Sequence, residues 1–314
     1  LVEERRRHGA IVAVQIRRPL FVTGLPRTGT TLLHALLACD PEARAPLHWE
    51  TLFPTVADGA VAARRIRTCR RNLDWFHVLN PAMRRIHPLG ATLAEECLIL
   101  TSYSLLSFQF ETSYAVPTYQ TWLESTDLRP MYRWHRRLLK HLQYQRPGAR
   151  WVLKAPAHLF GIDAIRAVYP DAVFVFTHRD PLDVVASNAS LHTVLRRAFA
   201  AGVDPHRVGR ENSVRWCEGM RRALAARDAD ADGADSCFDV GYTDLMRDPL
   251  GVVGRIYARF GLDFSTAAEK AMRSFLAANP KDRHGRHEYD VAAFGLDRGE
   301  ELARYRDYRE RFGL

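Results

Sequence analysis

The chain has 314 residues, 47% of them hydrophobic and 26% charged, and a formal net charge of +9 at pH 7. Its length and apolar content suit one large α/β domain with helical insertions better than two small domains. The positive charge admits a polyanionic partner, but the basic residues are scattered along the chain, which argues against a nucleic-acid-binding face, and no apolar run approaches the roughly 18 residues of a membrane-spanning helix.

The first predicted strand leads into a glycine-rich loop. Residues 19–23 are an apolar run, residues 24–31 read Gly-Leu-Pro-Arg-Thr-Gly-Thr-Thr, and a helical pattern begins at Thr30. A glycine-rich turn between a strand and a helix presents backbone N–H groups and the positive end of the helix dipole to an anion. We therefore predict that this loop binds a phosphate group.

The loop departs from the usual pattern of nucleoside triphosphatases. Thr30 stands where their lysine reaches the β- and γ-phosphates, while Arg27 offers a cation inside the loop. No later strand ends in the aspartate that would complete a Mg²⁺ site, since the best buried strand, residues 172–178, runs into Arg179. The sequence thus predicts a site for an anionic group without a metal.

The rest of the chain reads as a helical insertion followed by strand–helix units. Residues 57–149 show helical periodicity with breaks at prolines. Strands are then predicted at 150–156, 172–178 and 237–240, with helices between them, and a charged helix at 298–312 ends the chain. This alternation predicts a P-loop-like, three-layer α/β domain with a central parallel sheet of four to five strands.

We expect a single domain spanning residues 1–314. Its nucleotide-binding core would comprise residues 19–56 and 150–296, and the insertion 57–149 would lie on the acceptor side.

Charged side chains follow three of the predicted strands. The Gly24 loop, Lys154 and Arg179 each come directly after a strand, and ligands of open parallel sheets collect at the carboxyl ends of strands. Lys154 is one of only four lysines among 45 basic residues. Because a compact ammonium is not interchangeable with a guanidinium, a lysine at this position in an arginine-rich chain indicates a specific role. Arg179 and Ser187, eight residues apart, suit a second phosphate clamp, although pairing of Arg179 with a nearby aspartate is an equal alternative.

Three ordered motifs carry a family resemblance: residues 23–33, residues 153–159, and residues 177–181 together with Ser187. Together they resemble the sulfotransferases that use 3′-phosphoadenosine-5′-phosphosulfate (PAPS), in particular the bacterial branch related to tyrosylprotein and carbohydrate sulfotransferases. The match runs from about residue 19 to 296. The resemblance implies PAPS as co-substrate, no metal, and transfer of a sulfuryl group to a hydroxyl.

The resemblance also implies roles for individual residues. Arg27, Thr28, Gly29, Thr30 and Thr31 would bind the 5′-phosphosulfate, and Arg179 with Ser187 the 3′-phosphate. Tyr242 lies in a segment similar to one whose tyrosine is near the adenine, although Thr243 replaces the usual glutamate. The basic segment 281–287, with Lys281 and Arg286 as candidates, resembles one that closes over the 3′-phosphate, and a charged surface loop is the alternative.

Two residues are candidates for the base that takes the acceptor proton. Glu50 resembles the glutamate of tyrosylprotein sulfotransferases, at a spacing two residues longer, and we favour it over His158, which resembles the histidine of the cytosolic enzymes. A salt bridge for Glu50, and helix capping or packing for His158, are the structural alternatives. Lys154 is expected to contact the bridging oxygen or the sulfonate, with Arg27 sharing this task.

The acceptor and the cellular setting are less defined. Aromatic residues of the insertion suit an apolar or ring-bearing alcohol, and a small-molecule, lipid or saccharide acceptor all fit. Five widely spaced cysteines without a CxxC pair predict neither a disulfide framework nor a zinc site, and with no cleavable leader pattern at residues 1–10 we expect a soluble cytoplasmic protein. The alternatives are a P-loop kinase or nucleoside triphosphatase and a non-catalytic nucleotide-binding protein.

Overall fold

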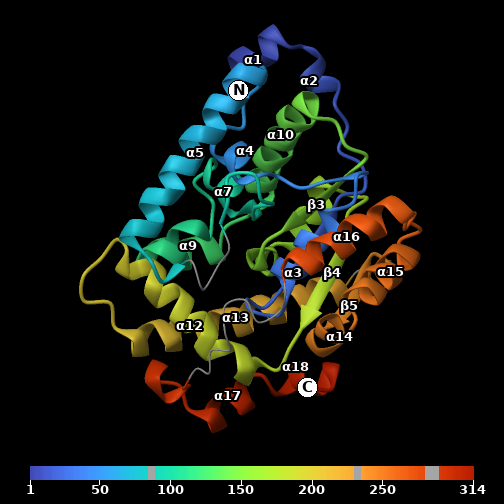
Figure 1. Ribbon diagram of the computed structural model, residues 1–314. Coiled ribbons are helices and arrows are strands. Elements are labelled where there is room, and N and C mark those ends of the chain that lie inside the picture. The colour runs from blue at the N-terminus through green and yellow to red at the C-terminus, as the bar shows by residue number, and fades with distance from the viewer. Residues whose placement is uncertain (84–88, 230–234, 280–289) are drawn as a thin grey trace.

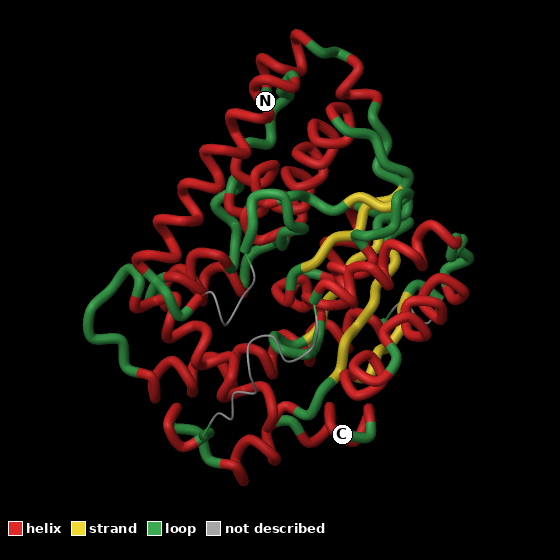
Figure 2. The backbone as a smooth tube through the Cα atoms, viewed as in Figure 1, coloured by secondary structure: helices red, strands yellow, loops and turns green. Residues whose placement is uncertain are grey.

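The computed structural model describes residues 1–83, 89–229, 235–279 and 290–314. At its centre lies a five-stranded parallel sheet of order β2-β3-β1-β4-β5, the yellow strands of Figure 2. The strands are β1 (Leu20–Gly24), β2 (Ala43–Arg44), β3 (Arg150–Lys154), β4 (Val173–His178) and β5 (Cys237–Gly241). The predicted α/β class and parallel sheet are confirmed.

The register of the sheet aligns the carboxyl ends of the three middle strands. Val22 of β1 lies opposite Lys154 of β3, and Gly24 of β1 lies opposite Thr177 of β4. The connection from β1 leads to β2 on one side of the sheet, and the connection from β4 leads to β5 on the other side, so the chain leaves the neighbouring ends of β1 and β4 in opposite directions. Such a switch point is where open α/β sheets bind ligands.

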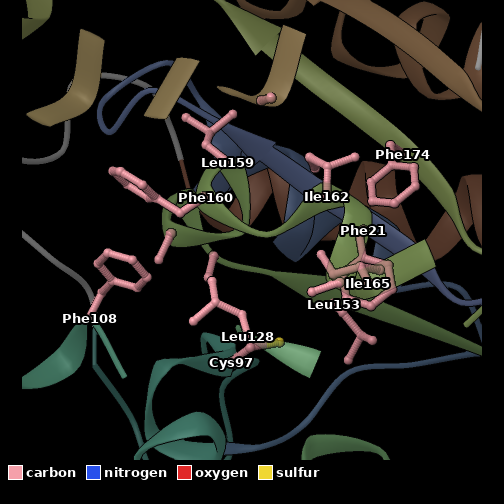
Figure 3. Packing of buried hydrophobic residues seen from close by; sticks show 14 of the residues in the cluster. Phe21, Cys97, Phe108, Leu128, Leu153, Leu159, Phe160, Ile162, Ile165 and Phe174 are labelled. Carbon is pink, nitrogen blue, oxygen red and sulfur yellow. The ribbon is translucent and has the colours of Figure 1, made fainter. Parts of the chain in front are cut away.

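Helices cover both faces of the sheet (Figure 1). Side chains of a strand alternate between faces, so Leu20 and Val22 pack in one cluster with α3 (Thr30–Leu37), α15 (Pro249–Arg259) and α16 (Thr266–Ala278). Phe21 points to the other face, where it stacks on Phe174 among α10 (Arg129–Gln145), α11 (Ile162–Val168) and α13 (Pro205–Asp228). Figure 3 shows Phe21 and Phe174 there with Ile162, Ile165 and Leu153.

The segment between β2 and β3 is helical, as its periodicity predicts. It comprises α4 (His48–Leu52), α5 (Gly59–Leu79), α7 (Cys97–Ser102), α8 (Gln109–Ser113), α9 (Pro117–Glu124) and α10. In Figure 1, α5 lies on the side of the molecule opposite α15 and α16. The insertion therefore contributes α10 to the layer that covers the sheet, while α5 lies farther from it.

The remaining elements lie at the two ends of the chain and around β4 and β5. They are α1 (Val2–Arg7), α2 (Ala10–Ala13), the 3₁₀ turns η1 (Pro156–Phe160) and η2 (Ala292–Phe294), α12 (Pro181–Arg197), α14 (Tyr242–Arg247), α17 (Arg298–Arg304) and α18 (Arg306–Phe312). No helix among the described residues has the length and apolar character needed to cross a bilayer.

Two helix predictions are wrong in detail. The expected helix at 298–312 is two helices, α17 and α18, because the chain turns at Tyr305, whose buried hydroxyl donates to the carbonyl of Ser213. The helix predicted between the strands at 150–156 and 172–178 begins instead as the 3₁₀ turn η1, and α11 starts only after Gly161. At Tyr305 a tertiary contact overrides the local helical pattern.

Buried histidines make the fold sensitive to acid. Burial lowers the pKa of His34, His135 and His192 to about 3, whereas an unfolded histidine titrates near 6.5. Below pH 6.5 the unfolded chain therefore binds more protons than the folded one, and stability is lost as the pH falls toward 3. We expect each of these histidines to lower the free energy of unfolding by about 2 kcal/mol at pH 5 relative to pH 7.5.

Urea unfolding at pH 7.5, 6 and 5 measures this loss. A His135→Gln variant should lose about 2 kcal/mol less stability over this range, while His206→Gln, at an exposed position, should behave like the parent. A free energy of unfolding that stays constant down to pH 5 contradicts the expectation.

Candidate active site

The loop of residues 24–31 connects β1 to α3, and two glycines allow it to pack against neighbouring elements. A Cβ at Gly24 would lie 2.4 Å from the carbonyl oxygen of Thr177. Gly29, with φ of 90°, would place a Cβ 2.9 Å from a methyl group of Leu245. The hydroxyl of Thr28 donates to the carbonyl of Leu25 at 2.6 Å and contacts the hydroxyl of Thr177 at 2.6 Å. The loop is therefore held in one shape by β4 and α14.

In this conformation of the loop, the first residues of α3, Thr30 and Thr31, face the cavity described below. The first N–H groups of a helix have no acceptor within the helix and favour an anion. Arg27 adopts a left-handed conformation, with φ of 68°, at the turn just before these groups. The hydroxyl of Thr28 is taken up inside the loop, so Thr30 and Thr31 are the loop hydroxyls that reach the cavity described below.

We expect Gly24→Ala to disrupt the loop. The added methyl group would meet backbone atoms of β4, which cannot move without breaking the sheet, so the variant should lose about 1–3 kcal/mol of stability. Thermal unfolding measures the loss of stability, and nucleotide titration measures the weaker binding expected of a disrupted loop. Gly9→Ala, where a Cβ meets nothing within 4 Å, is the matched control. A Gly24→Ala protein with parental stability would show that the contact with Thr177 is unimportant.

The predicted phosphate clamp lies beside the loop. Nη1 of Arg179 lies 3.4 Å from the carbonyl oxygen of Arg27, and its guanidinium carbon lies 4.2 Å from the centre of the Tyr242 ring. Nε of Arg27 donates to the hydroxyl of Ser187 at 3.2 Å. Arg179 also pairs with the carboxylate of Asp183 at 3.4 Å, which is the alternative interpretation, and its contacts with Arg27 and Asp183 are both exposed. The fold thus gathers Arg27, Arg179, Ser187 and Tyr242 around one end of the loop.

Lys154 approaches the other side of the loop from the end of β3. Its side chain is only 2% exposed, and Nζ donates to the hydroxyl of Thr31 at 3.3 Å and forms an ion pair with Glu96. A buried ammonium requires such a partner, because an unpaired charge is costly to remove from water. A lysine charge therefore stands next to the first turn of α3.

A cavity of about 440 Å³ opens beside these groups. The loop contributes Arg27, Gly29, Thr30 and Thr31 to its lining, and His48, Glu95 and Glu96 contribute the insertion's titratable groups. Its apolar lining comes from the insertion, α12 and α13, and includes Phe76, Leu98, Ile99, Phe108, Leu191 and Trp216. Most ligand sites combine such an apolar wall with a few polar groups.

The structure does not place either sequence-predicted base in the cavity lining. The carboxylate of Glu50, buried on α4, pairs with Arg44 at 3.0 Å and accepts the N–H of Leu47 at 2.9 Å. His158 is buried against Phe21, its Nδ1 lies 2.9 Å from the hydroxyl of Tyr132, and burial holds its pKa well below 6.5. Both side chains thus make the contacts of the structural alternatives, and their role as base stays a prediction.

Two further predicted residues cannot be placed. Lys281 and Arg286 lie outside the described residues. Among the described residues, no three His, Cys, Asp or Glu side chains come together as they do at metal sites.

Sequence reasoning missed His48, Glu95 and Glu96. The two adjacent glutamates directly before an apolar run are visible in the sequence, but they reach the cavity only because α7 packs against α4 and α10. His48 is two residues from the chosen Glu50, and residues two apart on a helix point in different directions. No pattern in the sequence indicates which side of α4 faces the cavity.

The fold and the site define an α/β protein with a P-loop-like fold, in which a glycine loop, two arginines and a lysine lie near one cavity. The chain belongs to the sulfotransferase family, whose family model matches residues 19–266.

Solved structures support this assignment. The sulfotransferase STF1 from Mycobacterium tuberculosis H37Rv superposes with a TM-score of 0.85 at 34% identity, covering 96% of this chain and 80% of that one. The sulfotransferase STF9 from Mycobacterium avium gives a TM-score of 0.83 at 27% identity, covering 99% of this chain and 80% of that one.

Curated relatives are also mycobacterial. The omega-hydroxy-beta-dihydromenaquinone-9 sulfotransferases Stf3 of Mycobacterium bovis and Mycobacterium tuberculosis are each 28% identical over 269 residues. The match covers 82% of this chain but 66% of each relative, just under two thirds of their length.

Proposed function

We propose that the protein transfers the sulfuryl group of PAPS to a hydroxyl of a small-molecule or lipid acceptor. The observation that carries this proposal is the meeting of three features at one edge of the sheet: the glycine loop, the guanidinium of Arg179, and an apolar cavity. Family membership supports the reaction type.

The residues present fit a nucleotide with an anionic group at each end. Because Gly29 carries no side chain, the loop packs closely against Tyr242 and Leu245 of α14, which brings the ring of Tyr242 beside the loop. We assign the 5′-phosphosulfate to the amides of the loop and the hydroxyls of Thr30 and Thr31. The 3′-phosphate is assigned to Arg179 and Ser187, with the ring of Tyr242 beside them near the adenine.

When bound, PAPS supplies the activated sulfuryl group. The chain's own contribution is electrostatic, because Lys154 and Arg27 flank the loop where negative charge develops on the leaving oxygen. Fixed charges in a site of low water content stabilise such charge without reorganising during the reaction. The ion pair with Glu96 holds the ammonium of Lys154 toward Thr31.

We propose an apolar alcohol as the acceptor class. Phe76, Leu98, Ile99 and Phe108 make the insertion side of the cavity apolar, and burial of such surface favours a hydrocarbon chain or ring over a polar sugar. The curated relatives are named for a menaquinone-derived alcohol, which agrees with this lining. A cytoplasmic location is proposed with it, since all five cysteines are free thiols.

An acceptor screen with PAPS carrying a labelled sulfuryl group tests the proposal. We expect label on a long-chain or prenyl alcohol, in buffer containing EDTA, and none on a hydrophilic monosaccharide. ATP labelled in its γ-phosphate, with Mg²⁺, is the parallel donor that tests a kinase reaction. Phosphoryl transfer from ATP, or PAP (adenosine 3′,5′-bisphosphate) binding without sulfuryl transfer to any alcohol, would refute it.

A further inference from the structure

A histidine and a glutamate form a pair in the cavity wall. His48 begins α4, and its Nδ1 contacts a carboxylate oxygen of Glu95. The other oxygen of Glu95 accepts the N–H of Glu96 at 2.8 Å, so the carboxylate is held at both ends. Both residues are 8% exposed and line the cavity. A carboxylate at Nδ1 places the ring proton there and leaves Nε2 as the atom that can accept a proton.

This pair lies next to the charges at the loop. Glu96, the residue after Glu95, is paired with Lys154, which donates to Thr31. Three further titratable groups interact with Glu95: His34 on α3, which also lies near Lys154, Cys69 on α5 and Cys97 on α7. The imidazole therefore stands between the loop and the apolar wall, where the hydroxyl end of an apolar alcohol would meet the sulfuryl group.

We propose that His48 is the general base for the acceptor hydroxyl and that Glu95 is the residue that positions its imidazole, an inference that rests on the proposed sulfuryl transfer. The proton of the hydroxyl moves to Nε2 as the oxygen forms its bond to sulfur. The bond from sulfur to the bridging phosphate oxygen breaks, and its electron pair leaves with PAP. The imidazolium then releases its proton to solvent.

The geometry separates His48 from the bases that the sequence suggested. The carboxylate of Glu50 is engaged by Arg44 and by the N–H of Leu47, and it does not line the cavity. His158 lies beneath the loop against Phe21 and Tyr132. Of these three side chains, His48 alone lines the cavity within the described residues.

Substitution and nitrogen NMR test the inference together. We expect His48→Gln to lower kcat by about 10²- to 10⁴-fold, the usual contribution of a general base, with PAP affinity within threefold of the parent. We expect kcat of the parent to fall as the pH is lowered, because the base becomes protonated, and this fall should be absent in His48→Gln. Glu95→Gln should lower kcat less and move that fall to lower pH, because the imidazolium loses its neighbouring carboxylate. His141→Gln, which breaks a histidine–glutamate pair away from the cavity, is the matched control and should leave kcat unchanged.

The ¹⁵N spectrum of the parent gives a readout independent of turnover. At pH 8, Nδ1 of His48 should carry the proton and Nε2 should not, and Glu95→Gln should redistribute the proton. A folded His48→Gln protein with kcat within threefold of the parent overturns the base assignment while leaving sulfuryl transfer standing. Should that variant fail to fold, a proton found on Nε2 in the parent overturns it instead. A parent that binds PAP but sulfates no alcohol refutes the proposed function and this inference with it.

Discussion

Lys154→Ala should lower kcat for sulfuryl transfer by about 10²- to 10³-fold, the effect of removing one group that stabilises transition-state charge. The reason is the position of the ammonium, buried at the end of β3 and donating to Thr31 at the first turn of α3. Steady-state rates with saturating PAPS and acceptor measure the loss. Lys270→Ala removes a lysine from the exposed face of α16 and should keep the parental rate.

The ion pair of Lys154 complicates the single substitution. Removal of the ammonium leaves the carboxylate of Glu96 unpaired and close to the bound sulfate, which adds repulsion to the lost attraction. Lys154→Ala combined with Glu96→Gln removes both charges and isolates the catalytic effect. If the double variant regains the parental kcat, Lys154 serves only to neutralise Glu96 and the electrostatic role is wrong.

Arg179→Ala should weaken binding of PAP by about 10- to 100-fold, as expected for loss of hydrogen bonds to a charged group. The same substitution should change the affinity for AMP, which lacks the 3′-phosphate, by less than threefold. Comparing the losses of affinity for PAP and AMP separates the contribution of the 3′-phosphate from that of the adenine. This comparison is needed because Arg179 also lies beside the ring of Tyr242, which we place near the adenine. Calorimetric titration of both nucleotides gives the four dissociation constants.

The matched control for Arg179 is Arg247, which lies on α14 with an exposed side chain paired to Asp244. Arg247→Ala removes the same charge from the protein, so it should leave both affinities unchanged if the effect at Arg179 is local. Equal losses of PAP and AMP affinity in Arg179→Ala would show that this side chain acts through the loop or the adenine and not through the 3′-phosphate.

The sheet and its glycine loop were predictable because their signals are local. Strands buried on both faces read as continuous apolar runs, as residues 172–176 do, and parallel strands bring their carboxyl ends to one edge. The proximity of Arg179 to the loop followed from those two facts alone. The positions of the motifs at the ends of predicted strands therefore predicted which residues come together on the nucleotide side.

The acceptor side was less predictable because it depends on how short helices are oriented. His48 and Glu50 lie on the same five-residue helix, and only packing of α4 against α5 and α7 decides which of them meets the cavity. The partner of His48, Glu95, lies 47 residues away in the loop before α7. Contacts of this kind leave no periodic pattern in the sequence.

The most direct test of the account is a crystal structure of the protein with PAP. The account predicts the 5′-phosphate on the backbone amides of residues 27–31 and the 3′-phosphate within hydrogen-bond distance of the guanidinium of Arg179, in the same nucleotide. A nucleotide bound elsewhere, or one whose 3′-phosphate faces solvent while Arg179 keeps its contact with Asp183, would contradict the account.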